Sequence, residues 1–222
     1  GSNRIDIVLY KDEPVAVINS DDNAILNIFG GLKLNFTGTQ FVKDDGSPYN
    51  GPIEVNADYL RPNSLDTFTN MPGSLFAQTA DNEAVNLQTY GMVSVDLFSP
   101  SGETLEIADE SSVTIEYPIN FDQIDIGPET ITLWYFDENV GYWKEDGQAI
   151  RAGNTYIAEV SHFTWWNIDV PFELVNLCFS LNSVEQNGSS PYFVAITNDS
   201  NQLIYSGIIL TDDAECGFIP AN

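Results

Sequence analysis

The stretch that decides the fold is ITLWYFDENVGYWKEDG, residues 131–147. Residues 131–136 are mostly aromatic, β-branched or otherwise apolar, and such side chains suit a pleated, half-buried surface. Residues 137–141 then combine acidic, amide and glycine residues, which favour a tight turn. The stretch therefore predicts a β-strand that ends in a turn.

The same pattern extends outward over most of the chain. Hydrophobicity alternates with a period of two, turn residues interrupt it at intervals of about ten residues, and helical periodicity is nearly absent. Residues 44–47 and 99–102 are further turn clusters, and residues 65–76 are predicted as a short helix or an ordered loop. We expect an all-β, antiparallel β-sandwich with strands at 5–10, 15–18, 32–36, 53–60, 92–98, 112–117, 131–136, 156–160 and 164–168.

A domain boundary is predicted near Asp169-Val170-Pro171. A new alternating run begins at Leu174, and only a short stretch of chain follows it, which is little for a complete sandwich. We therefore expect a β-sandwich domain over residues 1–170. A second, smaller or truncated β-sandwich-like domain is expected over residues 171–222.

The charge balance excludes some classes of partner. The chain has 33 acidic residues against 7 lysines and arginines, a formal net charge of -26. Nucleic acid is excluded because phosphate binding needs a basic patch, and anionic membrane surfaces are disfavoured for the same reason. No apolar run approaches the ~20 residues of a membrane-spanning helix, so we expect no membrane insertion by this segment. The acidity itself favours solubility and salt tolerance over a dedicated cation-binding role.

The two cysteines, Cys178 and Cys216, match no metal-binding spacing. We predict that they form a structural disulfide, because isolated pairs of this kind are typical of exported β domains. A disulfide in turn indicates an oxidising compartment.

Several motifs occur in an order that resembles one family. They are FVKDDGSP (41–48), GPIEV (51–55), MPG (71–73), YGMVSV (90–95), the stretch at 131–147, and VSHFTWWN (160–167). Together they resemble a domain of bacterial surface proteins and of the ectodomains of the cartilage intermediate layer proteins, a ZU-five-like β-sandwich. The resemblance implies an exported protein, extracellular, at the cell surface or periplasmic. Its implied partners are other surface proteins or glycans.

The C-terminal part carries a second resemblance. The segments LVNLCF (174–179) and GFIPAN (217–222) are similar to the start of a carboxypeptidase-regulatory-like, transthyretin-like domain. The resemblance implies a β domain that is incomplete within residues 171–222.

Three tryptophans, Trp143, Trp165 and Trp166, are candidates for an aromatic platform that binds a sugar ring. The alternative is packing in the core or at an interface. Since Trp165 and Trp166 are adjacent in a predicted strand, their side chains must point to opposite faces of the sheet.

Calcium is the one cofactor that we weigh. Asp44 and Asp45, with Asp21 and Asp22, lie in predicted turns where clustered oxygens can bind a hard cation. The complete acidic loop of the helix–loop–helix calcium proteins is absent. We therefore favour Asx-turns for these residues and expect no firm metal site.

One segment is chemically suggestive. His162 is the only histidine, and His162-Phe163-Thr164 resembles the His-Phe-Ser site at which some ZU-five-type domains cleave themselves. The Thr164 hydroxyl would attack the carbonyl of Phe163, with His162 as the base. The alternative is that His162 is a hydrogen-bonded strand residue, with Phe163 in the core and Thr164 favoured by its β-propensity.

The sequence contains no other motif of catalysis, such as a nucleophile elbow, a zinc-binding helix or a phosphate loop. We therefore predict a non-enzymatic extracellular or cell-surface module with a structural or adhesive function. Two alternatives stay open, namely a glycan-binding module and a self-processing domain that is cleaved between Phe163 and Thr164.

Overall fold

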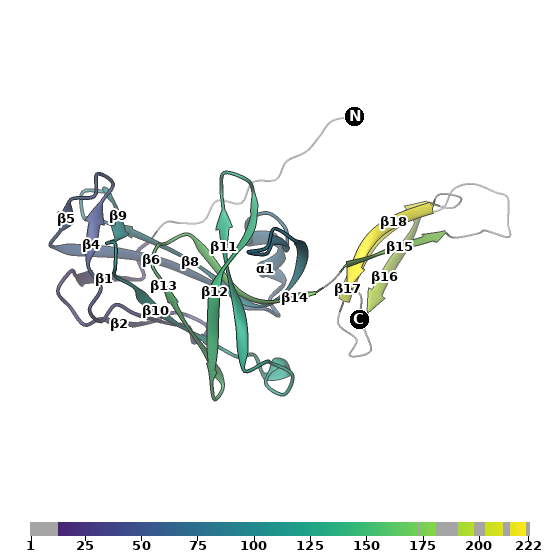
Figure 1. Cartoon of the computed structure of the whole chain (residues 1–222), viewed down its shortest axis with the longest axis horizontal. Helices are drawn as coiled ribbons and strands as arrows, with labels where there is room; N and C mark the ends of the chain where they lie inside the picture. Colours follow the sequence, from purple (N-terminus) through teal and green to yellow (C-terminus); the bar gives the residue numbers. More distant parts are fainter. Residues whose placement is uncertain (1–12, 173, 181–190, 198–202, 211–213, 221–222) are drawn as a thin grey trace. The chain divides into compact units, whose positions relative to one another are not determined.

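The structure is a computed structural model that describes residues 13–172, 174–180, 191–197, 203–210 and 214–220. The chain divides into two compact units, Gly1–Val170 and Pro171–Asn222. Figure 1 shows the strands of each unit. The strand predicted at residues 5–10 lies outside the described residues.

The first unit is built almost entirely from antiparallel β-strands, which confirms the predicted all-β sandwich class. Hydrogen bonds connect its strands into one continuous sheet in the order β2-β3-β10-β13-β12-β11-β14-β8-β9-β4-β5, with β1 beside β6, β6 beside β8, and β7 beside both β8 and β12. The strands are β1 (Ala16–Asn19), β2 (Ile25–Asn27), β3 (Lys33–Asn35), β4 (Phe41–Lys43), β5 (Pro48–Tyr49), β6 (Pro52–Leu60), β7 (Phe76–Gln78), β8 (Ala84–Phe98), β9 (Thr104–Ile107), β10 (Val113–Pro118), β11 (Thr130–Asp137), β12 (Tyr142–Ala152), β13 (Thr155–Val160) and β14 (Trp165–Phe172).

The stretch at 131–147 forms the hairpin of β11 and β12 (Figure 1). The predicted turn is present, since the amide of Gly141 donates to the carbonyl of Asp137 at 2.8 Å. Lys144 on β12 reaches back to the Asp137 carboxylate at 2.6 Å. The predicted strand and its turn are confirmed, and β12 is a long strand that the sequence pattern did not predict.

The predicted segment at 65–76 is partly helical. Helix α1 covers Leu65–Asn70, and Phe76 already belongs to β7. A second short helical turn, the 3-10 helix η1 (Phe121–Gln123), follows β10. In the part of the chain that the structure describes, no helix is long and apolar enough to cross a membrane.

Two hydrophobic clusters hold the first unit together. The larger core combines buried side chains from strands far apart in the sequence, which shows that the sheet is folded over a shared interior. The smaller core consists of Leu60, Ala77, Leu87, Met92, Trp134, Phe136 and Trp143. Strand β10 follows the expected alternation, with Val113, Ile115 and Tyr117 fully buried.

The second unit contains two strand pairs. Strand β15 (Leu174–Ser180) pairs antiparallel with β18 (Ala214–Pro220), and β16 (Pro191–Thr197) pairs with β17 (Leu203–Leu210). Cys178 and Cys216 face each other directly in the β15–β18 register, with their Cα atoms 4.1 Å apart, and form a disulfide. The predicted disulfide is therefore confirmed.

Candidate functional site

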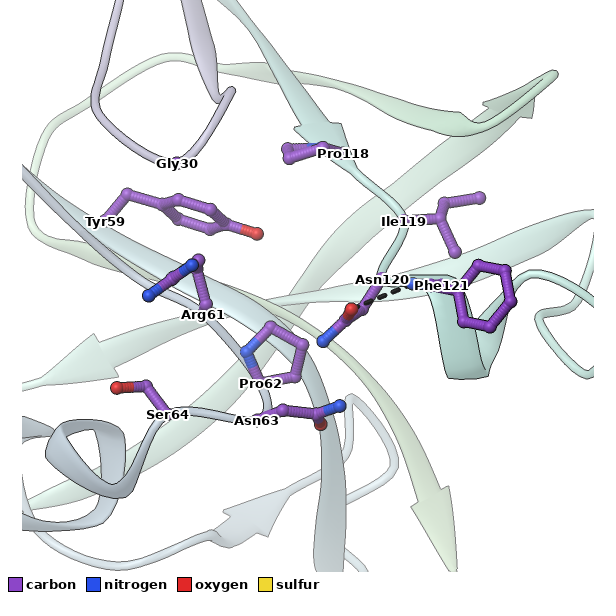
Figure 2. A pocket seen from close by; sticks show the side chains of 10 residues that line it. All are labelled: Gly30, Tyr59, Arg61, Pro62, Asn63, Ser64, Pro118, Ile119, Asn120 and Phe121. Carbon is purple, nitrogen blue, oxygen red and sulfur yellow. Dashed lines mark hydrogen bonds between the residues drawn. The ribbon is translucent and has the colours of Figure 1, made fainter.

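A pocket of about 430 Å³ opens on the first unit where three segments meet (Figure 2). One segment is the turn between β2 and β3, the second is the end of β6 with the loop that follows it, and the third joins β10 to η1. The volume lies within the usual range of small-ligand sites, about 300–1,000 Å³. Its lining residues are Gly30, Tyr59, Arg61, Pro62, Asn63, Ser64, Pro118, Ile119, Asn120 and Phe121.

The Tyr59 ring forms a rigid part of this wall. Gly30 packs so closely that a Cβ at this position would lie 2.9 Å from the Tyr59 ring, and one at Gly91 would lie 2.8 Å from its hydroxyl. Both glycines have left-handed φ angles, +92° and +125°, which other residues rarely adopt. Tyr59 is 8% exposed, and this burial raises its pKa. The ring is therefore fixed between two backbone segments.

The loop after β6 is fixed by its own hydrogen bonds. The carbonyl of Arg61 accepts from the Ser64 amide at 3.1 Å and from the Thr67 hydroxyl at 2.5 Å. Across the pocket, Asn63 Nδ2 donates to Asp122 Oδ2 at 2.6 Å. This contact ties the second segment to the third.

Two exposed aromatic rings lie at this site. The guanidinium of Arg61 lies over the ring of Phe29, 5.9 Å from its centroid, a cation–π arrangement. Phe29 is 87% exposed and Phe121 is 88% exposed. Large apolar rings that stay in solvent beside a pocket provide surface on which a ligand can pack.

The third segment contributes an amide. Asn120 Oδ1 accepts from the Phe121 amide at 2.8 Å and so caps η1. Its Nδ2 has no partner in the part of the chain that the structure describes, and in Figure 2 it points to the same side as Pro62. The pocket thus combines hydrogen-bond donors with an aromatic ring, an arrangement that can hold a polar ligand.

The predicted tryptophan platform does not form. Trp143 is fully buried in the smaller core, and its Nε1 donates to the Ser74 carbonyl at 3.0 Å. Trp166 is 1% exposed in the larger core, whereas Trp165 packs partly buried against the smaller one. The two neighbours do point to opposite faces, but these faces meet two different cores, so a shared exposed surface is impossible.

The His162-Phe163-Thr164 segment lies in a bend between β13 and β14. The His162 ring packs against the rings of Tyr135 and Trp166, with centroids 5.4 and 4.8 Å apart, and burial lowers the pKa of its imidazole. The Thr164 hydroxyl donates to the Phe136 carbonyl at 3.1 Å. An attack on the Phe163 carbonyl would require that hydroxyl to leave its present acceptor. Self-cleavage stays an untested alternative.

The aspartates proposed for calcium lie in turns. Asp45 Oδ1 accepts from the Ser47 amide two residues on, at 2.9 Å. Hydrogen bonding to the Ser47 side chain and to this amide lowers the pKa of Asp45. Asp22 Oδ2 accepts from the Asn19 amide at 2.9 Å. The Asp45 bond is that of an Asx-turn, whereas the Asp22 bond runs back to the residue three positions before it. Within the described ranges, no group of three or more metal-ligating side chains converges. Calcium binding by these aspartates stays an untested alternative.

Sequence reasoning missed a buried polar network in the sheet of the first unit. Asp169 on β14 is fully buried, and its carboxylate accepts from the Tyr90 amide at 3.1 Å and from Asn167 Nδ2 at 2.5 Å. Thr89 adds a bond to Asn167 Oδ1 at 3.2 Å. Burial raises the pKa of Asp169 well above its ordinary value of 3.8. An aspartate near a predicted domain boundary suggests an exposed loop, so the sequence contains no signal for this network.

Comparison with known proteins identifies distant relatives of part of this chain. No protein-family profile and no solved structure matches the chain. The chain is 31% identical to cartilage intermediate layer protein 2 of Homo sapiens over 155 residues, which cover 66% of this chain and 13% of that protein. It is a distant homologue of the cartilage intermediate layer proteins over part of its length.

Two further relatives belong to the same group. Cartilage intermediate layer protein 1 of Sus scrofa is 26% identical over 154 residues, covering 63% of this chain and 25% of the relative. The Mus musculus protein 1 is 24% identical over 184 residues, covering 74% of this chain and 15% of the relative. The predicted resemblance to these proteins is confirmed, and the chain spans at most a quarter of the length of the three relatives named here.

Proposed function

We propose that this chain is a non-enzymatic module of an exported protein, with a structural or adhesive function in the extracellular matrix or at a cell surface. The homology to cartilage intermediate layer proteins carries this proposal. The Cys178–Cys216 disulfide supports it independently, because structural disulfides form and persist in oxidising compartments. The strongly acidic composition suits a protein that must stay soluble outside the cell.

Glycan binding is the second candidate function, and one observation favours it. Phe121 exposes 88% of its surface beside a pocket that also presents Arg61, Asn63 and Asn120. Sugar sites commonly combine an aromatic face, which packs against the ring, with amide and guanidinium groups that bind the hydroxyls. Phe121 would thus take the function that the sequence assigned to the tryptophans.

Two finer assignments belong to the proposal. The second unit would be the start of a transthyretin-like, carboxypeptidase-regulatory-like domain, with which its antiparallel strand pairs are compatible. The whole protein would be a bacterial surface protein whose other partners are surface proteins or glycans.

Cell fractionation tests the proposed location, and a binding screen tests the adhesive function. We expect the natural protein in the exported fraction, without free thiols under denaturing, non-reducing conditions. We also expect saturable binding of the chain to at least one member of a panel of immobilised matrix proteins and glycans. A cytoplasmic protein with two free thiols would refute export, and an empty panel would contradict adhesion.

A further inference from the structure

Arg61 differs from the other basic side chains that the structure describes. The three lysines each bind a carboxylate at 2.6–2.9 Å, and the Arg151 guanidinium donates to three backbone carbonyls. Within the described residues, the Arg61 guanidinium binds neither a carboxylate nor a backbone carbonyl, although the chain has 33 acidic residues. Its guanidinium therefore keeps donors that an external acceptor can use. The lysine pairs are Lys33–Glu116, Lys43–Glu103 and Lys144–Asp137.

The direction of this guanidinium is restricted by its surroundings. Its stem packs against the turn at Gly30, where a Cβ would lie 3.3 Å from Arg61 Cδ. Its head lies over the Phe29 ring, and its backbone carbonyl is bonded to Ser64 and Thr67. A side chain that is already held in place loses less conformational entropy when a ligand binds.

Two amides of the pocket offer matching groups, Asn120 on the opposite wall and Asn63 on the same loop as Arg61. The Nδ2 of Asn120 is a donor without a described partner, and the Oδ1 of Asn63 is an acceptor, since only its Nδ2 bonds to Asp122. Phe121 follows Asn120 in the chain and leaves its ring to solvent. Arg61 and Asn63 thus lie on the loop after β6, and Asn120 and Phe121 lie on the segment across the pocket (Figure 2).

We propose that this pocket binds an acidic sugar, with Arg61 holding the carboxylate and Phe121 packing against the sugar ring. The inference rests on the glycan-binding candidate above and names its ligand class. A guanidinium donates two parallel hydrogen bonds to a carboxylate, and amides both donate to and accept from hydroxyls. The pocket volume of about 430 Å³ suits one or two sugar units better than a long chain segment.

The charge of the protein selects among acidic glycans. A net charge of -26 repels densely sulfated polyanions, and this repulsion acts over about 8 Å at physiological ionic strength. A sugar with a single carboxylate gains the short contact to Arg61 and suffers far less repulsion. We therefore expect sparsely charged, uronate-type glycans to bind, and sodium glucuronate is a suitable probe.

The proposal is tested by titrating the whole chain with glucuronate and recording the amide chemical shifts by heteronuclear NMR. Glucose serves as the neutral analogue, and acetate and a short peptide with a free C-terminal carboxylate serve as the other carboxylate sources. We expect glucuronate to bind about 10-fold more tightly than each of them, with shifts around residues 59–64 and 118–121. Arg61→Gln should weaken binding by about 10-fold or more, and Phe121→Ala by a smaller factor.

Lys33→Gln is the matched control, because it removes one positive charge outside the pocket and should leave glucuronate affinity unchanged. The inference is overturned if glucose, acetate or the peptide binds as tightly as glucuronate, if Arg61→Gln has no effect, or if tens of millimolar glucuronate shift no pocket residue. Such a result would leave the adhesive function standing, since export and binding to the panel are measured separately.

Discussion

Replacing Asp169 by asparagine should change how the stability of the first unit depends on pH. Asp169 is fully buried, and no cation among the described residues offsets this burial, which raises its pKa well above the ordinary 3.8. A carboxyl with a raised pKa binds a proton more tightly in the folded state than in the unfolded state. Its contribution to stability is therefore present at low pH and is lost as the pH rises above about 4 toward the folded-state pKa.

The linkage relation gives the size of the effect. For one proton, the free energy of unfolding falls by up to about 1.4 kcal/mol per pH unit within that window. The amide that replaces the carboxyl has no such proton, so the stability of Asp169→Asn relative to wild type should rise with pH at the same slope. The Asn167 amide must turn so that its Oδ1 faces the new side chain and its Nδ2 donates to Thr89. This rearrangement costs free energy that does not depend on pH. It therefore shifts the stability difference between Asp169→Asn and wild type by a constant and leaves the slope of that difference against pH unchanged.

Urea unfolding at a series of pH values measures this slope. All four tryptophans lie between residues 134 and 166, so their fluorescence reports the first unit alone. Asp21→Asn, on an exposed turn, separates the loss of one negative charge from the loss of the buried carboxyl. If the difference between Asp169→Asn and wild type stays constant from pH 4 to pH 8, then the buried carboxyl is not protonated on folding and the reasoning fails.

Three further predictions concern the disulfide, calcium and self-processing. Cys178→Ser combined with Cys216→Ser should lower the stability of the second unit by about 4 kcal/mol, because the disulfide closes a loop spanning 38 positions. Limited proteolysis within residues 171–222 should then be faster, and an unchanged rate would contradict this prediction. Calcium should raise the melting temperature only slightly, and a large saturable shift at micromolar calcium that Asp45→Asn removes would reveal a specific site. Denaturing mass spectrometry of aged protein should show one intact species, unchanged in Thr164→Ala, whereas fragments divided at that bond would establish self-cleavage.

The sequence predicted those features that depend on neighbouring residues. Alternation along β10 and the turn residues before Gly141 act within a few positions, so the strand and the turn lie where the pattern indicates. Strand β12 was missed because Lys144-Glu145-Asp146-Gly147 is polar and looks like a continuation of the turn. It forms a strand because it pairs with both β11 and β13.

The candidate site could not be predicted in the same way, because it depends on contacts between distant segments. Asn63 bonds to Asp122, and Gly30 packs on Tyr59, across separations that no periodicity encodes. The sequence wrongly suggested an exposed platform of tryptophans, because an aromatic residue in a strand can pack in a core as easily as on a surface. Only the three-dimensional packing shows that Trp143 is buried whereas Phe121 is exposed.

The residues of the pocket divide into those that stabilise the fold and those that are placed to contact a ligand. Tyr59 contacts the buried Tyr117 edge-on, with ring centroids 6.3 Å apart, and Tyr117 belongs to the larger core. Since Tyr59 also lines the pocket, the pocket wall is continuous with the core and moves little unless the core moves. Arg61 and Phe121 extend from this rigid wall into solvent, so substituting them should change binding without unfolding the domain. A loss of glucuronate binding in Arg61→Gln would therefore report on the ligand contact itself.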